Sequence, residues 1–157
     1  MTTPIFFSLL VLPVLLLCGR CHGYAYNDDV HDLLPSYGFP RGLLPDNVVS
    51  YTLPSSSSDG SFSVQLSSPC YVQFHGQLVY YDVDISGRLS YGVVTDVVGI
   101  QAKELFIWLS VTGMKVNKEN GAIEFYVGAL SKSLPEDEFA DIPTCRKRIV
   151  AAEVASS

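Results

Sequence analysis

The carboxylate-rich run Asp82-Val83-Asp84-Ile85-Ser86-Gly87 is one group of residues that could bind a metal. It matches the first half of an EF-hand calcium loop, which presents oxygen ligands at alternate positions before an invariant glycine. The last ligand of such a loop is a glutamate, but Val93 stands at that position. The flanking residues also have strand character, so we interpret the run as a turn with solvated carboxylates and predict no metal site.

Hydrolysis by a nucleophile would need a serine or cysteine beside a histidine. Behind the N-terminal leader only His31 and His75 remain, and the chain has no Gly-x-Ser-x-Gly motif. Paired carboxylates for glycoside hydrolysis occur at Asp82 with Asp84 and at Glu136-Asp137-Glu138, but their spacing singles out no acid and partner. We interpret the histidines as surface residues, and we assign no catalytic residue and no cofactor.

Aromatic residues are numerous, with 9 Tyr, 8 Phe and 1 Trp. The stretch from Leu105 to Leu109 is predicted to be a strand with apolar side chains on both faces, so both faces should be covered. Strand propensity and ordinary core packing explain much of this pattern. Amphipathic rings also suit a cavity for a lipid or flat aromatic molecule, and the predicted cavity-facing, ligand-binding residues are Tyr91, Phe106, Trp108 and Tyr126.

The N-terminus predicts export. Ile5 to Leu17 is apolar apart from Ser8, and a run of about 13 residues suits a signal-peptide core, whereas a membrane span needs roughly 20. We predict a signal peptide over residues 1–23, with cleavage after Gly23 or after Ala25. A β domain then covers residues 24–146 and a flexible tail residues 147–157, with no transmembrane segment in the mature chain.

Charge and cysteine content restrict the partners and the compartment. The chain carries 16 acidic and 10 basic residues, a net charge of −6, which disfavours nucleic acid as a partner. Only Cys70 and Cys145 remain behind the leader. In an oxidising lumen an isolated pair most simply forms one disulfide, and the pair lacks the histidine neighbours of a zinc site and the spacing of a redox motif.

Spacing of apolar residues predicts one short helix followed by strands. Val30, Leu33, Leu34 and Tyr37 lie on one face of a helix over Asp28–Tyr37, capped by Asn27 or Asp28 and shortened by Pro35. The predicted strands are Val48–Leu53, Ser61–Leu66, Tyr71–Phe74, Gln77–Val83, Leu89–Val98, Glu104–Val116 and Ala122–Val127, with a loop from there to Cys145. The predicted fold is mainly β, a single small antiparallel β-barrel of about seven strands with one short N-terminal helix.

Several motifs together resemble the plant "domain of unknown function 538" family. They are Gly42-Leu43-Leu44-Pro45, Ser68-Pro69-Cys70, Tyr80-Tyr81-Asp82, Gly87-Arg88-Leu89-Ser90-Tyr91-Gly92, Gly99-Ile100-Gln101-Ala102-Lys103-Glu104-Leu105-Phe106, Trp108-Leu109, Val127-Gly128 and Pro143 with Cys145. The resemblance covers about Val30 to Cys145. It implies a small β-barrel with a short N-terminal helix behind a signal peptide, and a fold likened to lipid-binding domains of the bactericidal/permeability-increasing type. It transfers no catalytic residues.

The resulting hypothesis is a secreted β-barrel that binds a lipid or other apolar or amphipathic small molecule without catalysis. One alternative is a weak esterase or hydrolase acting in the cell wall, for example through a serine near His75. Another is an interaction module whose Phe106 and Trp108 face meets a protein partner.

Overall fold

The computed structural model describes residues 28–55 and 59–147. The predicted signal peptide lies outside the described residues, as does all of the predicted tail except Lys147, so both stay predictions. Within the described part, no helix is long and apolar enough to cross a membrane.

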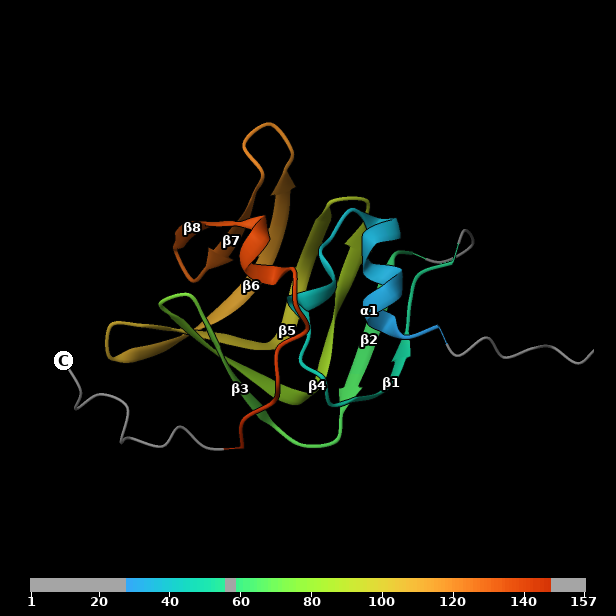
Figure 1. Cartoon of the computed structure of the whole chain (residues 1–157), viewed down its shortest axis with the longest axis horizontal. Helices are drawn as coiled ribbons and strands as arrows, with labels where there is room; N and C mark the ends of the chain where they lie inside the picture. The colour runs from blue at the N-terminus through green and yellow to red at the C-terminus, as the bar shows by residue number, and fades with distance from the viewer. Residues whose placement is uncertain (1–27, 56–58, 148–157) are drawn as a thin grey trace, which may run out of the picture.

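The N-terminal segment is helical over two turns of different kinds (Figure 1). An α-helix α1 (Val30–Leu33) continues into a 3-10 helix η1 (Leu34–Tyr37), because the ring of Pro35 is incompatible with a longer α-helix. Gly38 ends the segment with a left-handed φ of 84°. The cap is Asp29, one residue later than predicted, and its carboxylate accepts from the backbone N–H of His31 at 3.1 Å.

In the described residues, eight antiparallel strands follow the helical segment, which confirms the prediction of a mainly β fold. They are β1 (Val48–Thr52), β2 (Ser61–Leu66), β3 (Cys70–Phe74), β4 (Gln77–Ser90), β5 (Val93–Glu104), β6 (Ile107–Asn117), β7 (Ala122–Val127) and β8 (Leu130–Pro135). A 3-10 helix η2 (Arg41–Leu43) precedes β1, and η3 (Glu136–Phe139) follows β8. Strand β8 and helix η3 occupy a segment predicted to be a loop.

Strand β4 organises the sheet because it is long enough to pair with two strands on one edge. Its first half pairs with β3 and its second half with β2, while β5 pairs along its other edge. The residues from Asp82 to Ser86 lie inside this strand. Asp82 and Asp84 therefore belong to a continuous strand and not to a turn, so that expectation was wrong.

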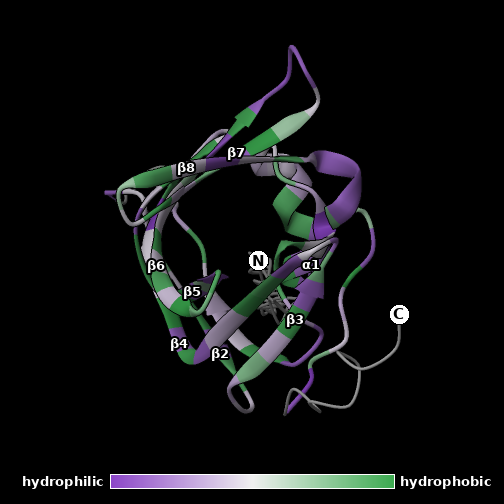
Figure 2. Ribbon diagram, turned by 90° about the vertical axis from the view of Figure 1, so that its left-hand side faces the viewer, coloured by the Kyte–Doolittle hydropathy of each residue, from purple (hydrophilic) through white to green (hydrophobic). Residues whose placement is uncertain are grey.

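The sheet curls around a common interior but is not closed into a barrel (Figure 2). Its strand order is β1-β2-β4-β5-β6-β7-β8, with β3 beside β4, and no described strand joins β8 to β1 or β3. The predicted closed barrel is therefore not confirmed. Helical segments and the link between η1 and η2 cover the open side instead, and they bury Val30, Leu34, Phe39 and Phe139 in the same core as the strands.

The segment that follows η3 is fixed along the β3 edge as far as Arg146. Cys70 and Cys145 are adjacent, with their Cα atoms 5.3 Å apart, in an arrangement compatible with the predicted disulfide. The next residue forms a bridge with β3, in which the Tyr71 N–H donates to the Arg146 carbonyl at 2.8 Å. Strand β3 is thereby tied to a segment more than 70 residues away in the chain, as the separation of 75 residues between the two cysteines shows.

Candidate functional site

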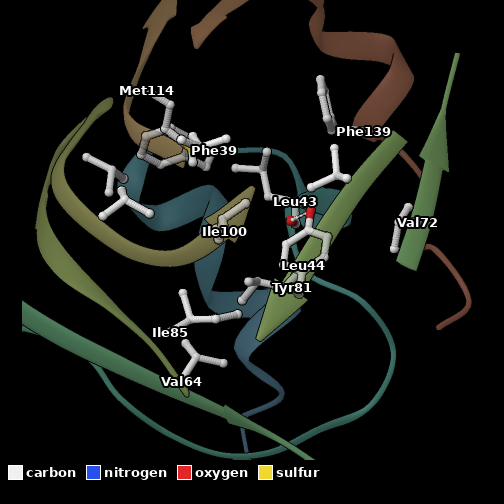
Figure 3. Packing of buried hydrophobic residues seen from close by; sticks show 14 of the residues in the cluster. Phe39, Leu43, Leu44, Val64, Val72, Tyr81, Ile85, Ile100, Met114 and Phe139 are labelled. Carbon is white, nitrogen blue, oxygen red and sulfur yellow. Dashed lines mark hydrogen bonds between the residues drawn. The ribbon is translucent and has the colours of Figure 1, made fainter. Parts of the chain in front are cut away.

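The interior enclosed by the sheet is apolar and incompletely filled (Figure 3). It holds two neighbouring spaces of about 40 and 50 Å³. Both are lined by Leu43, Ile100 and Met114, so these three side chains stand between the two spaces. A space of this size holds a few water molecules at most, and apolar cavities stay dry.

Tyr81 is the polar group deepest in this interior. Its side chain is buried and its hydroxyl donates to the Leu43 carbonyl at 2.8 Å, which joins β4 to η2 (Figure 3). Burial raises the pKa of the Tyr81 hydroxyl well above its ordinary value of 10.0, because the phenolate would have to exist without water. The hydroxyl therefore stays protonated and keeps donating across the pH range of most proteins.

Removal of this hydroxyl is expected to destabilise the fold. Tyr81→Phe leaves a buried carbonyl without its donor and should lower the free energy of unfolding by about 1–3 kcal/mol. Above pH 10 the unfolded state loses the Tyr81 proton while the folded state keeps it. The contribution of Tyr81 to stability is therefore complete below pH 10. Above pH 10 the free energy of unfolding falls by up to about 1.4 kcal/mol per pH unit, and Tyr81→Phe should make this fall less steep.

Urea unfolding between pH 7 and 11 measures both effects. Tyr80→Phe is the matched control, because Tyr80 is the neighbouring residue on the outer face of the same strand, against Tyr71 and Trp108. Equal stabilities of the two variants at pH 7 would contradict a structural role for the Tyr81 hydrogen bond.

Three polar side chains line the first of these two spaces, at one end of the interior. We name Gln77, Glu104 and Lys132 the polar mouth. The Lys132 ammonium contacts the Gln77 side-chain oxygen and lies 3.4 Å from the Glu104 carboxylate. Gln77 is buried, and its side-chain amide donates to the Lys103 carbonyl at 2.9 Å, so this buried polar group has a hydrogen-bond partner. Apart from the mouth and Tyr81, all residues around this space are apolar.

Strand register explains how residues so far apart in sequence converge. Gln77 is the first residue of β4, Glu104 is the last of β5, and Lys132 lies near the start of β8. The pairing of Val79 with Ala102 places the beginning of β4 beside the end of β5. The mouth is therefore at the end of the sheet that carries the β3–β4, β5–β6 and β7–β8 turns.

The mouth offers one cation, one carboxylate and one amide beside an apolar space. Such a set can orient the polar group of an amphipathic molecule whose apolar part is inside. Sequence reasoning missed all three residues, because none belongs to a motif and the segment containing Lys132 was predicted to be a loop. Only the pairing of the strands brings them together.

The four residues predicted to face a cavity do not line this interior. Phe106 and Trp108 are exposed at the β5–β6 turn, and Tyr126 is exposed on β7. Tyr91 is also exposed, at the β4–β5 turn, where its hydroxyl accepts from the Lys118 ammonium at 2.6 Å. Consecutive hairpin turns lie at opposite ends of a sheet, so Tyr91 is not brought together with Phe106. The inward orientation was wrong, and ligand binding by these residues stays untested.

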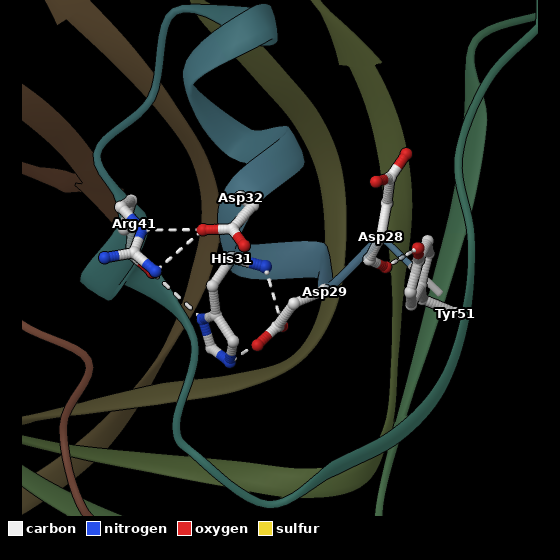
Figure 4. Close-up of polar contacts among 6 residues, drawn as sticks. All are labelled: Asp28, Asp29, His31, Asp32, Arg41 and Tyr51. Carbon is white, nitrogen blue, oxygen red and sulfur yellow. Dashed lines mark hydrogen bonds and ion pairs between the residues drawn. The ribbon is translucent and has the colours of Figure 1, made fainter. Parts of the chain in front are cut away.

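The two histidines occupy different environments. His75 is exposed in the β3–β4 turn, but His31 is only 3% exposed, which corrects its interpretation as a surface residue. The His31 Nδ1–H donates to the Arg41 carbonyl at 3.0 Å, and Arg41 in turn pairs with Asp32 at 2.7 Å (Figure 4). The Tyr51 hydroxyl donates to the Asp28 carbonyl nearby. These contacts fix α1 against η2 and β1, which is a structural role.

Metal binding finds no support in the described ranges, where no group of three or more His, Cys, Asp or Glu side chains could hold an ion. Comparison with curated proteins and with solved structures found no match. A model of one protein family, described as "Protein of unknown function, DUF538", matches residues 30–140. The match spans α1, all eight strands and η3, and the chain belongs to the DUF538 family.

Proposed function

We propose that this protein binds an amphipathic small molecule of the lipid class, with the apolar part in the interior and an acidic polar group at the polar mouth. The observation that carries the proposal is the lining of the interior. Apolar side chains surround it from η2, from β3 to β8 and from η3, and the charged Glu104 and Lys132 lie only at one end. This combination suits binding and orientation of a molecule, and the proposal includes no catalysis.

The present volume of the interior implies that a ligand enters by displacing side chains. Small-molecule sites usually measure about 300–1,000 Å³, whereas the two spaces measure about 40 and 50 Å³. Met114, which separates them, is an unbranched side chain that adapts readily to a new partner. Its movement, together with that of Leu43, would join the two spaces into one.

Phe139 is the residue that we propose to act as the cover of the interior. It is buried against Phe74 and Phe125, with ring centroids 4.7 and 5.5 Å away. Its helix η3 is a single short turn, so it can move with few backbone hydrogen bonds broken. Outward movement of η3 would widen the space beside the polar mouth.

The proposed compartment is the secretory pathway or the extracellular space. Support comes from the leader-like residues at the N-terminus and from the adjacent Cys70 and Cys145, since disulfides persist in oxidising compartments.

Binding of a fluorescent fatty acid, dansyl-labelled undecanoic acid, tests the proposal directly. When the protein is added to the probe, the emission of the dansyl group should rise and reach saturation. Lys132→Met removes the cation of the mouth and is expected to weaken binding at least tenfold, because a charge-assisted hydrogen bond contributes about 1.5–3 kcal/mol. The same variant should bind the uncharged alcohol analogue of the probe with the same affinity as the natural chain.

Two controls make the outcome decisive. Lys118→Met removes an exposed lysine at the Tyr91 end of the sheet and should leave binding unchanged. Ala102→Val adds two methyl groups to the wall of the interior and should weaken binding of both probes. Absence of binding by the natural chain, or an equal loss in both lysine variants, would contradict the proposed function.

A further inference from the structure

The β5–β6 turn exposes a continuous apolar surface. Leu105, Phe106 and Ile107 are 88%, 93% and 58% exposed, and Trp108 follows them. We name Leu105–Trp108 the hydrophobic tip. In Figure 1 this hairpin extends beyond the neighbouring turns at the left of the molecule. Single exposed apolar residues are common in proteins, but a contiguous exposed run marks an interaction site.

The backbone of the tip is as unusual as its side chains. Leu105 has a φ of 54°, in the left-handed region where glycine and asparagine are the favoured residues. A bulky apolar side chain is disfavoured there, and at 88% exposure Leu105 gains little from packing within the fold. Packing within the fold therefore does not explain a leucine at this position.

Amphipathic groups surround the base of the tip. The Trp108 ring lies 6.0 Å from Tyr71 and 6.3 Å from Tyr80, measured between ring centroids. The Lys103 ammonium lies 6.0 Å from the Trp108 ring. Tryptophan, tyrosine and lysine are the residues that prefer the boundary between the acyl chains and the headgroups of a membrane, because each combines an apolar body with a polar end.

We propose that the hydrophobic tip inserts into the surface of a phospholipid bilayer, with Leu105 and Phe106 among the acyl chains and Trp108 at the headgroups. Charge is complementary to such a surface. Lys103 and Lys132 outnumber Glu104 beside the tip, whereas the chain as a whole has a net charge of −6. Lys103, whose ammonium lies by the Trp108 ring, is therefore in position to contact a lipid phosphate when the tip is inserted.

The area of the tip favours a bilayer over a protein partner. A large side chain buries about 150–250 Å² when it is fully exposed beforehand. Because Ile107 and Trp108 are only 58% and 36% exposed, the tip as a whole offers about 400–700 Å², less than the roughly 800 Å² per partner in a stable protein interface. A fluid bilayer, in contrast, surrounds a protruding hairpin completely. Glu104 of the polar mouth immediately precedes Leu105, so insertion would bring the mouth to the lipid surface. This inference goes beyond the proposed function and does not require it.

Trp108 provides the measurement, because it is the single tryptophan of the chain. Its emission reports on the tip alone, whether or not the leader is still attached. We expect a blue shift on titration with vesicles of phosphatidylcholine containing one fifth phosphatidylglycerol, and quenching by brominated acyl chains. Leu105→Asn with Phe106→Ser should weaken partitioning about 100-fold, because burial of each side chain is worth roughly tenfold.

Urea unfolding distinguishes a loss of membrane binding from misfolding of the tip variant. Asparagine accommodates a left-handed φ, so the tip variant should unfold at the same urea concentration as the natural chain or at a higher one. The matched control is Val49→Ser with Val98→Ser, which removes side chains that are 60% and 63% exposed elsewhere on the sheet. The control should keep the blue shift.

Three results would overturn the inference. They are an unchanged Trp108 emission in the presence of vesicles, an equal loss in the tip and control variants, and a dimer, seen by sedimentation, that forms through the tip without any vesicle binding. Binding of the dansyl probe is measured without vesicles, so failure of the proposed function and failure of membrane insertion are distinguishable.

Discussion

Replacement of Gly42 by alanine is expected to lower the free energy of unfolding by at least about 3 kcal/mol, near the upper end for overpacking. A Cβ atom at this position would overlap the Asp141 carbonyl oxygen and lie 2.5 Å from the Phe139 carbonyl oxygen. Both are backbone atoms, so no side chain can rotate away. The segment after β8 would have to move outward, and Phe139 would lose its packing against the core.

Gly76→Ala is the control for backbone conformation. Gly76 has a φ of 75°, but nothing lies within 4 Å of an added Cβ, so the expected cost is about 1–2 kcal/mol from the left-handed φ alone. Gly42 has an ordinary φ of −91°, and its cost comes from contact alone. Urea unfolding of the two variants measures the difference, and equal destabilisation would contradict the close approach of η2 to the segment after η3.

Reduction of the Cys70–Cys145 pair is expected to lower the free energy of unfolding by about 4 kcal/mol. The two residues are separated by 75 positions, and a loop of this length restricts the unfolded chain by roughly that amount in the chain-entropy model. The folded state also depends on the link, because the Cys145 segment extends along β3 and its N–H donates to the Asp46 carboxylate at 2.9 Å.

Urea unfolding with and without dithiothreitol measures this effect. The double variant Cys70→Ala with Cys145→Ala is the control and should be insensitive to the reductant. A change of less than about 1 kcal/mol on reduction, or two free thiols in the untreated protein, would show that the bond does not stabilise this fold.

Local sequence signals predicted the helical segment and the bounds of four of the eight described strands, but they ended β4 at Val83 and not at Ser90 and began the next strand at Leu89 and not at Val93. Apolar residues at helical spacing placed α1 and η1 between Asp28 and Tyr37, and Pro35 and Gly38 set the end of the segment. Alternation placed β1, β2, β3 and β7 to within one residue at each end. These features depend on residues close together in the chain, which is why periodicity and turn chemistry identify them.

Other predictions failed because neither burial nor strand pairing could be read from the sequence. The apolar stretch after Lys103 was expected to be one covered strand, but Leu105 and Phe106 form a turn and face outward. An apolar run normally indicates burial, so the sequence gives no sign that this run is exposed. Strand β8 was missed because Leu130–Pro135 has little strand propensity, and it forms only through its ladder with β7.

The sequence by itself determined the family, the mainly β character, the short helix and the two cysteines that could pair. Each of these depends on residue type and on local spacing. Only the tertiary structure decided that the sheet stays open, that Gln77, Glu104 and Lys132 meet at one end of an apolar interior, and that Leu105 and Phe106 are exposed. These features depend on strand register, because register brings together residues that are distant in the chain and the order of residues alone does not specify it.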